Sequence, residues 1–268
     1  MLNLPHLSVS SYRWGSGLAL SCLVLGLASG CRLFSLVGES SSQVGSSLTG
    51  SVLWRDSQTV TGTLGAGDQI NPRDGSFVDE ILITAEPGQI LIASMESEAF
   101  DAYLEVVDAQ GRVIAFNDDS GLDVNALLAV RLPEGGSYTL RATSFEPEST
   151  GNYWLAYTLT QLDWQESHSG RLQPGSLQHP DDGSWMEEYP ISGRAGQVLI
   201  ASLTSPDFDA FLQLLDPDGE VITWDDDQGG ARDALMIAFL PRTGTYTLRA
   251  NTYEPGQQGA YVLQYTLR

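Results

Sequence analysis

Residues 138–142 read Tyr-Thr-Leu-Arg-Ala, and the same five letters return unchanged as residues 246–250. The first, third and fifth side chains are apolar and the two between them are polar, which is the period of a β-strand with one buried face. This stretch belongs to a longer match. Shifted by 108 positions, the chain aligns with itself from Gly62 to Leu159 without an insertion or deletion. The chain therefore contains two copies of one unit.

The length of the repeat indicates that each copy is a globular domain. A period of about a hundred residues is longer than the 20 to 50 of solenoid units. Runs of about five to eight β-prone residues are separated by clusters of Gly, Pro, Asp and Asn, and no stretch keeps a helical period. Residues 90–93 and 198–201 are continuously apolar, as expected of strands covered on both faces. We therefore expect an all-β protein with a two-sheet sandwich at residues 57–161 and another at 165–268.

The charge of the chain limits its partners. Its 268 residues include 13 Arg, no Lys and 34 Asp and Glu, for a net charge of -21. Such a surface repels phosphate backbones, which argues against nucleic acid as a partner. Solubility or adaptation to salt would explain the same charge. Both cysteines, Cys22 and Cys31, precede the repeats, so no disulfide can form within either copy.

The first thirty residues have the layout of an export signal. Arg13 precedes an apolar run at 18–27, which is too short to span a bilayer and is followed by small residues and Cys31. An apolar run that ends on a cysteine resembles a bacterial lipobox, in which the cysteine is diacylated. We expect a signal peptide at 1–30 and a lipid on Cys31, followed by a Gly- and Ser-rich spacer at 31–56. An ordinary cleaved signal with a stray cysteine remains the alternative.

The residue after the cysteine bears on location. Arg32 stands where, in enteric lipoproteins, an aspartate would signal retention in the inner membrane. We therefore expect a lipid-anchored protein of the cell envelope, at the outer membrane or the cell surface. The spacer would hold the two domains away from the membrane.

Each copy carries one segment dense in oxygen ligands. Residues 116–121 read Phe-Asn-Asp-Asp-Ser-Gly, and residues 224–229 read Trp-Asp-Asp-Asp-Gln-Gly. Calcium takes about six to eight oxygen ligands, and three such side chains in sequence supply about half of them. The alternative is that these residues cap turns by accepting backbone N–H bonds. The candidate calcium ligands are Asp101, Asn117, Asp118 and Asp119 in the first copy and Asp209, Asp225, Asp226 and Asp227 in the second, with Glu80 and Glu188 as further donors.

A series of motifs recurs in the same order in both copies. It runs Phe-Asp-x-Tyr/Phe-Leu, Asp-x-x-Gly, Asn/Asp-Asp-Asp-x-Gly, Gly-x-Tyr-Thr-Leu-Arg-Ala and Gly-x-Tyr-x-Leu. This series resembles the bacterial pre-peptidase C-terminal domain over nearly the whole of both repeats. The resemblance implies a jelly-roll-like β-sandwich, similar to the collagen-binding domains of clostridial collagenases, that usually accompanies a secreted protease. It also implies calcium in some relatives, with ligands at Asp101, Asp118 and Asp119 and at Asp209, Asp226 and Asp227. In this sequence the leader, the spacer and the two repeats account for the residues given, so we do not expect a role beside an attached protease.

The motifs argue against an enzyme. The chain has no Gly-x-Ser-x-Gly and no His-Glu-x-x-His, and its repeats have no cysteine. Two linked copies on a lipid tether would gain avidity, which suits weak binding to an extracellular protein or polysaccharide. The candidate contacts are the aromatic residues Phe145, Trp154 and Tyr253. The alternative is a structural protein or interaction platform of the envelope, or an accessory to a separate secreted peptidase, without polymer binding.

Overall fold

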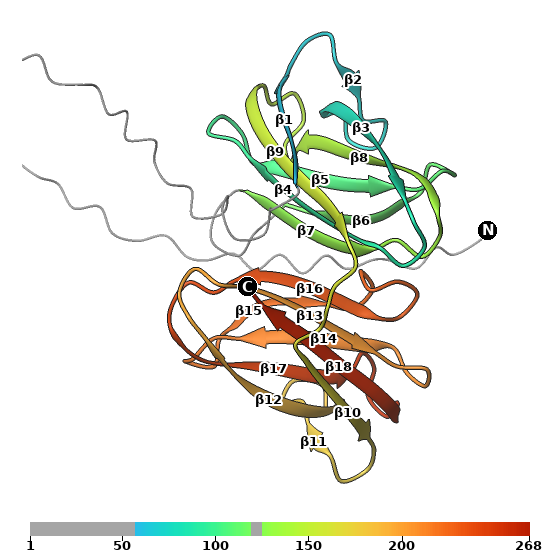
Figure 1. The fold of residues 1–268 in the computed structure, drawn as a ribbon, viewed down its shortest axis with the longest axis vertical. Coiled ribbons are helices and arrows are strands. Elements are labelled where there is room, and N and C mark those ends of the chain that lie inside the picture. Colours follow the sequence, from blue (N-terminus) through green and yellow to red (C-terminus); the bar gives the residue numbers. More distant parts are fainter. Residues whose placement is uncertain (1–56, 119–124) are drawn as a thin grey trace, which may run out of the picture. The chain divides into compact units, whose positions relative to one another are not determined.

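The computed structural model of the protein describes residues 57–118 and 125–268 (Figure 1). All the regular elements in these ranges are β-strands, and this confirms the predicted all-β fold. The first copy contains β1 (Gln58–Leu64), β2 (Gln69–Ile70), β3 (Phe77–Ala85), β4 (Ile90–Glu96), β5 (Ala102–Val107), β6 (Val113–Asn117), β7 (Ala126–Arg131), β8 (Gly136–Ser144) and β9 (Gly151–Thr160). The second contains β10 (Glu166–Leu172), β11 (Leu177–Gln178), β12 (Trp185–Gly193), β13 (Val198–Thr204), β14 (Ala210–Leu215), β15 (Val221–Asp225), β16 (Ala234–Phe239), β17 (Gly244–Thr252) and β18 (Gly259–Leu267).

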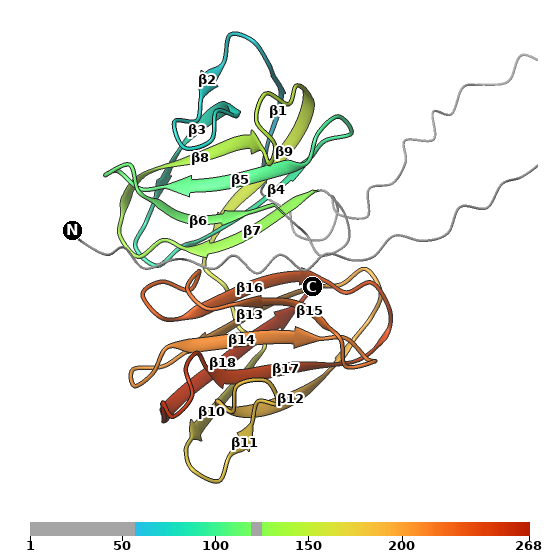
Figure 2. The same ribbon diagram turned by 180° about the vertical axis from the view of Figure 1, so that it is seen from behind.

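Each copy forms its own pair of antiparallel sheets. In the first copy the four-stranded sheet has the order β1-β9-β4-β7 and the five-stranded sheet the order β2-β3-β8-β5-β6. The second copy repeats this with β10-β18-β13-β16 and β11-β12-β17-β14-β15, and Figure 2 shows β14 and β17 side by side. Apart from the short β2 and β11, this is the order of an eight-stranded jelly roll. The predicted jelly-roll-like sandwich is confirmed in both copies.

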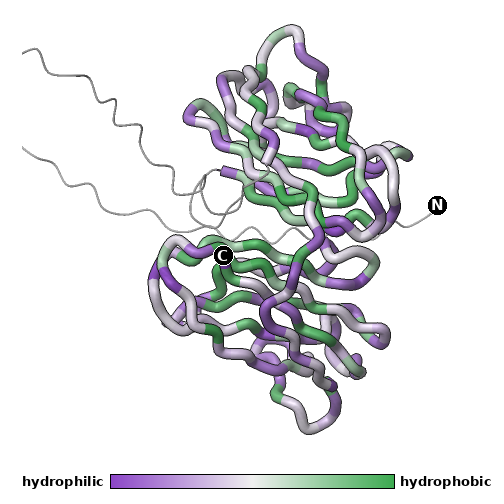
Figure 3. Tube along the Cα trace, viewed as in Figure 1, coloured by the Kyte–Doolittle hydropathy of each residue, from purple (hydrophilic) through white to green (hydrophobic). Residues whose placement is uncertain are grey.

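The core of each copy lies between its two sheets. On β8, Tyr138, Leu140 and Ala142 are buried in the first core, while Arg141 points away from it, as the alternation predicts. Figure 3 shows the hydrophobic stretches along the strands and mainly hydrophilic residues at the turns. The second core repeats the arrangement with the equivalent residues of β17.

A third apolar cluster joins the two copies within the compact unit that contains both of them. Ile90, Ile92 and Leu127 have their equivalents, Val198, Ile200 and Leu235, in the same cluster, whereas the buried Phe239 corresponds to Arg131. Trp164, in the connection between the copies, packs against it. This packing explains why residues 90–93 and 198–201 are continuously apolar. One face of each strand contacts the core of its own copy, and the other face contacts the other copy. The buried members are Ile90, Ile92, Leu127 and Ala129 of the first copy and Val198, Ile200, Leu235 and Phe239 of the second.

The predicted signal peptide, the lipidated Cys31 and the spacer lie outside the described residues, and so does Asp119. Among the described residues, no helix is long and apolar enough to cross a membrane.

Candidate functional site

Three aromatic rings gather on the outer face of the first five-stranded sheet. Tyr103 points outward from β5 because its neighbours Ala102 and Leu104 point into the core. Its ring lies 5.9 Å from that of Phe116 on β6, nearly parallel at 6°, and 6.4 Å from that of Phe145, just after β8. Phe116 and Phe145 are 55% and 54% exposed. We call these three residues aromatic cluster 1.

The second copy carries aromatic cluster 2 at the equivalent positions. The ring of Phe211 lies 5.5 Å from that of Trp224 and 6.1 Å from that of Tyr253. Trp224 is 57% exposed and Tyr253 48%. An exposed apolar patch that recurs at the same place in both copies is a candidate interaction surface.

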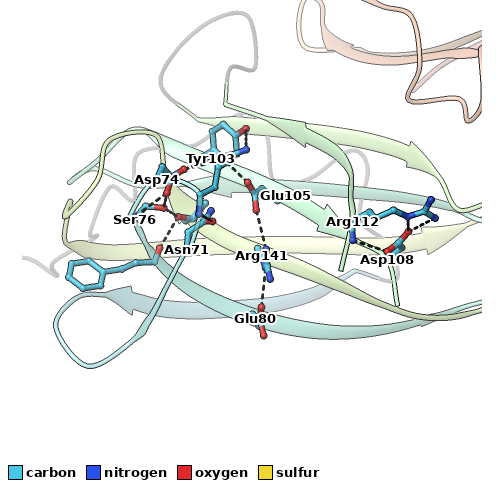
Figure 4. A network of polar contacts seen from close by, with 12 residues as sticks. Asn71, Asp74, Ser76, Glu80, Tyr103, Glu105, Asp108, Arg112 and Arg141 are labelled. Atoms are coloured by element: carbon cyan, nitrogen blue, oxygen red, sulfur yellow. Dashed lines mark hydrogen bonds and ion pairs between the residues drawn. The ribbon is translucent and has the colours of Figure 1, made fainter. Parts of the chain in front are cut away.

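A buried carboxylate lies next to cluster 1. The side chain of Glu105 is 1% exposed and forms ion pairs with Arg73, at 2.9 Å, and with Arg141, at 3.6 Å. Arg141 also pairs with Glu80, at 2.9 Å, and Figure 4 shows Glu80, Arg141 and Glu105 in one row across the sheet. The row follows from the strand register, which pairs Arg141 with both acids. Two guanidinium groups offset the cost of burying the Glu105 carboxylate.

Arg73 connects this network to the aromatic rings. Its guanidinium carbon lies 5.2 Å from the centre of the Tyr103 ring, and its Nη1 donates to the Tyr103 hydroxyl at 3.4 Å. It also pairs with Asp74, at 3.0 Å. Partial burial lowers the pKa of Arg73, but the hydrogen bonds to Asp74 and Tyr103 and the charge of Glu105 outweigh it and raise that pKa. The guanidinium is therefore fixed and charged on the face of cluster 1.

The second copy replaces this network with a less charged one. Gln213 stands at the position of Glu105, and His179 and Arg249 contact its Oε1 at 3.2 and 3.1 Å. Arg249 also pairs with Glu188, at 2.9 Å. The position of Arg73 is occupied by Asp181. Among the described residues, the one cation found over a ring of either cluster is Arg73 of the first copy.

The first residue of each acidic triplet caps its own loop. Asn117 Oδ1 accepts a hydrogen bond from the Leu127 N–H at 3.1 Å. Asp225 Oδ2 accepts bonds from the N–H groups of Gln228, at 3.1 Å, and Leu235, at 2.7 Å. Burial, together with the charges of Asp226 and Asp227, raises the pKa of Asp225 to about 7 against the effect of these bonds. At these two positions the capping alternative describes the observed contacts.

The other carboxylates of the second loop influence one another. Burial raises the pKa of Asp209, and the charge of Asp227 adds to this shift. Burial and the charge of Asp227 also raise the pKa of Asp226. The described residues contain no group of three or more His, Cys, Asp or Glu side chains placed to hold a metal ion. The loop gathers negative charge, and calcium binding there stays a prediction.

The acidic residues that precede β5 and β14 lie beside the aromatic clusters. The Phe145 N–H donates to the carbonyl oxygen of Asp101 at 2.9 Å, and the Tyr253 N–H to that of Asp209 at 2.8 Å. Burial raises the pKa of Tyr103, and the charge of Asp118 is one of the smaller causes. Asp101, Asp118 and Asp209 therefore adjoin the aromatic clusters.

The predicted aromatic contacts divide between the two sheets. Phe145 and Tyr253 belong to clusters 1 and 2, whereas Trp154 lies half-buried on β9 of the four-stranded sheet. Phe116 and Trp224 were not predicted as contacts, because in the sequence they are the first residues of the acidic segments. The signal available was an aromatic residue at the same position of both copies.

Comparisons with known proteins do not place the chain in a family. No family model and no curated protein matches it. Among solved structures it is similar to the periplasmic g-type lysozyme inhibitor PliG of Aeromonas hydrophila, at 16% identity over 39% of this chain and 86% of that one, with a TM-score of 0.30. It is also similar to the M60 catalytic domain with two CBM51 domains of Clostridium perfringens ZmpB, at 8% identity over 79% and 38% of the two chains, with a TM-score of 0.24. Tripeptidyl peptidase 2 matches at 10% identity over 79% and 23%, with a TM-score of 0.22. The chain spans less than two thirds of the last two proteins, and similarities at these TM-scores carry no argument about it.

Proposed function

We propose that the protein is a non-catalytic binding protein that contacts an extracellular polymer or protein through the aromatic clusters on the outer faces of its two five-stranded sheets. The observation that carries this proposal is the pair of aromatic clusters, which occupy equivalent positions and keep two rings about half exposed in each copy. Aromatic rings offer a large contact area with few rotatable bonds, so little entropy is lost when they bind.

The polar network beneath cluster 1 supports a pre-formed surface. Arg73 is held by Asp74 and Glu105 while it lies over Tyr103. Side chains that are already fixed lose less conformational freedom on binding than mobile ones do. In the second copy, Arg249 is held by Gln213 and Glu188 on the same face of the sheet.

Two faces on one chain would act together. When the first face binds a repetitive polymer, the second meets it at a raised effective concentration, so two weak sites give useful avidity. The proposal includes a lipid on Cys31 that anchors the protein in the cell envelope, and repeats of the pre-peptidase C-terminal type. Calcium in the acidic loops would order the edge of each aromatic cluster, because Asp101 and Asp209 bind the chain at Phe145 and Tyr253.

The second candidate is an interaction platform for one defined envelope protein, or an accessory to a separate secreted peptidase. The apolar interface between the copies supports this second candidate, because it joins the two copies into one scaffold. It predicts co-purification with one protein, with no retention on polymers.

The test is retention of the full chain on immobilised envelope polysaccharides and matrix proteins. We expect at least one polymer to retain the protein, and the double variant Phe116→Ala/Trp224→Ala to lose that retention. Leu82→Ala is the matched control, because Leu82 is 72% exposed but belongs to neither cluster. Equal retention of the double variant and the control would contradict the proposal.

A further inference from the structure

In the first copy, an arginine of the same chain lies on the aromatic cluster. Arg73, from the loop between β2 and β3, lies over the ring of Tyr103 and pairs with the buried Glu105. A guanidinium above an aromatic face is attracted by the negative charge of the π-system. Cluster 1 is therefore a cation site that the chain itself fills.

The second copy keeps the rings and lacks this cation. The residue equivalent to Arg73 is Asp181, whose side chain is 87% exposed. The residue equivalent to Phe116 is Trp224, and Trp is the aromatic side chain that attracts cations most strongly. The ring equivalent to Tyr103 is Phe211, and the Trp224 ring lies 5.5 Å from it. The second copy thus has a strongly cation-binding ring beside this position and a carboxylate where the first copy has its own arginine.

The charges around cluster 2 favour a cation from outside. Burial raises the pKa of Asp209, and the charges of Asp227 and Glu254 add to this shift. One buried oxygen of Asp209 accepts no hydrogen bond within the described residues. Two nearby arginines reduce this field: Arg249 is engaged by Glu188 and Gln213, and Arg232 acts on Asp209. The chain as a whole carries a charge of -21.

We infer that cluster 2, together with Asp181, binds an arginine side chain of a partner polypeptide. Arginine fits better than lysine because its planar guanidinium stacks on aromatic faces. A polypeptide is the source because one exposed cation–π contact contributes less than about a factor of ten in affinity, so further contacts along the sheet face are needed. This inference rests on the proposed function and specifies the partner of one of its two faces.

The test uses the full chain, labelled with nitrogen-15, and two short peptides. The first peptide has one arginine between glycines, and the second has citrulline, which keeps the shape and loses the charge. The chain has six tryptophans, so the indole N–H signal of Trp224 is identified by its loss in Trp224→Phe. We expect the arginine peptide to shift this signal and to bind at least about threefold more tightly than the citrulline peptide.

Two variants test the position of the cation. Asp181→Arg gives the second copy an arginine of its own, as in the first copy, and we expect it to abolish the peptide-induced shift of the Trp224 signal. Leu82→Ala is the control, since Leu82 is exposed on the first copy and belongs to neither cluster, and it should leave the affinity for the peptide unchanged. Unchanged melting temperatures establish that both variants are folded.

Three results would overturn the inference: equal binding of the two peptides, binding that survives in folded Asp181→Arg, or binding as tight for free arginine amide as for the peptide. A chain that is retained by a polymer but gives no arginine response refutes this inference and leaves the proposed function standing. If Asp181→Arg does not fold, the same comparison is made with Trp224→Ala, which we expect to lose the preference for arginine over citrulline.

Discussion

In the first copy a glutamate lies buried between two arginines, whereas in the second copy a glutamine occupies its position and a single arginine remains. The two changes belong together. Gln213 has no charge to balance, so the second copy can have Asp181 at the position of Arg73 without leaving a buried carboxylate short of a partner. The aromatic positions around these groups are kept. The comparison shows one scaffold whose ring positions are constant and whose charge chemistry differs between copies.

The largest expected difference comes from removing the arginine that both networks contain. Arg141→Met leaves the buried Glu105 with Arg73 alone, and we expect a loss of about 3 to 4 kcal/mol in the free energy of unfolding. Arg249→Met leaves a neutral Gln213 and should cost only about 1 kcal/mol. Urea denaturation measures both. Equal losses would mean that the buried charge does not distinguish the copies.

The interface between the copies should respond symmetrically, in contrast to the outer faces. Leu127 and Leu235 occupy equivalent positions of the shared apolar cluster and are 4% and 0% exposed. Either Leu→Ala change should cost about 2 to 3 kcal/mol, through lost burial and the cavity left behind. Urea denaturation of the two variants checks this. A difference above about 1 kcal/mol between them would contradict equivalent packing at these two positions.

Calcium tests whether the acidic loops bind a metal. At a hundredfold excess over its dissociation constant, a bound ion adds about 2.7 kcal/mol to stability, which raises the melting temperature of the full chain by several degrees. Asp226→Asn should lower the affinity for calcium, and titration calorimetry after chelation measures it. Absence of both heat and melting shift would leave these carboxylates as turn caps or solvated charges.

The pH dependence of stability should differ between the copies through one residue. The pKa of Asp225 in the folded protein is raised to about 7 from a usual value of 3.8, so the folded state holds the proton more tightly. The contribution of Asp225 to stability should therefore be greatest below about pH 4 and should fall by about 4 kcal/mol as the pH rises from there through 7. Asp225→Asn mimics Asn117 of the first copy and should remove this contribution, while the smaller contributions of Asp209 and Asp226, whose pKa values are also raised, remain. Urea denaturation between pH 5 and pH 8, with chelator present, provides the measurement, and an unchanged slope in the variant would refute the assignment to Asp225.

Much of the fold follows from side-chain periodicity. The alternation in residues 138–142 gives a strand with one buried face, and the continuous runs 90–93 and 198–201 give strands covered on both faces. What covers the second face could not be predicted, because an apolar surface does not specify its partner. In the structure the other copy covers that face, and Trp164 of the short connection packs against the same cluster.

The candidate site could be predicted only in part. Phe145 and Tyr253 were named, but their grouping with Phe116 and Trp224 depends on which strands become neighbours across the sheet. The charge networks could not be predicted for the same reason. Arg73 and Glu105 lie far apart in the sequence and come together only across the five-stranded sheet. Spacing along the chain does not show which acid will be buried.

The central claim is that the two aromatic faces bind together, and the most direct measurement is the affinity of the full chain for the polymer that retains it. Phe116→Ala and Trp224→Ala would be measured singly and combined. If both faces engage one polymer, each single variant should lose roughly tenfold or more in affinity, because avidity is lost with either face, and the double variant should lose retention altogether. Single variants that bind like the unaltered chain, or a double variant that is still retained, would contradict the account.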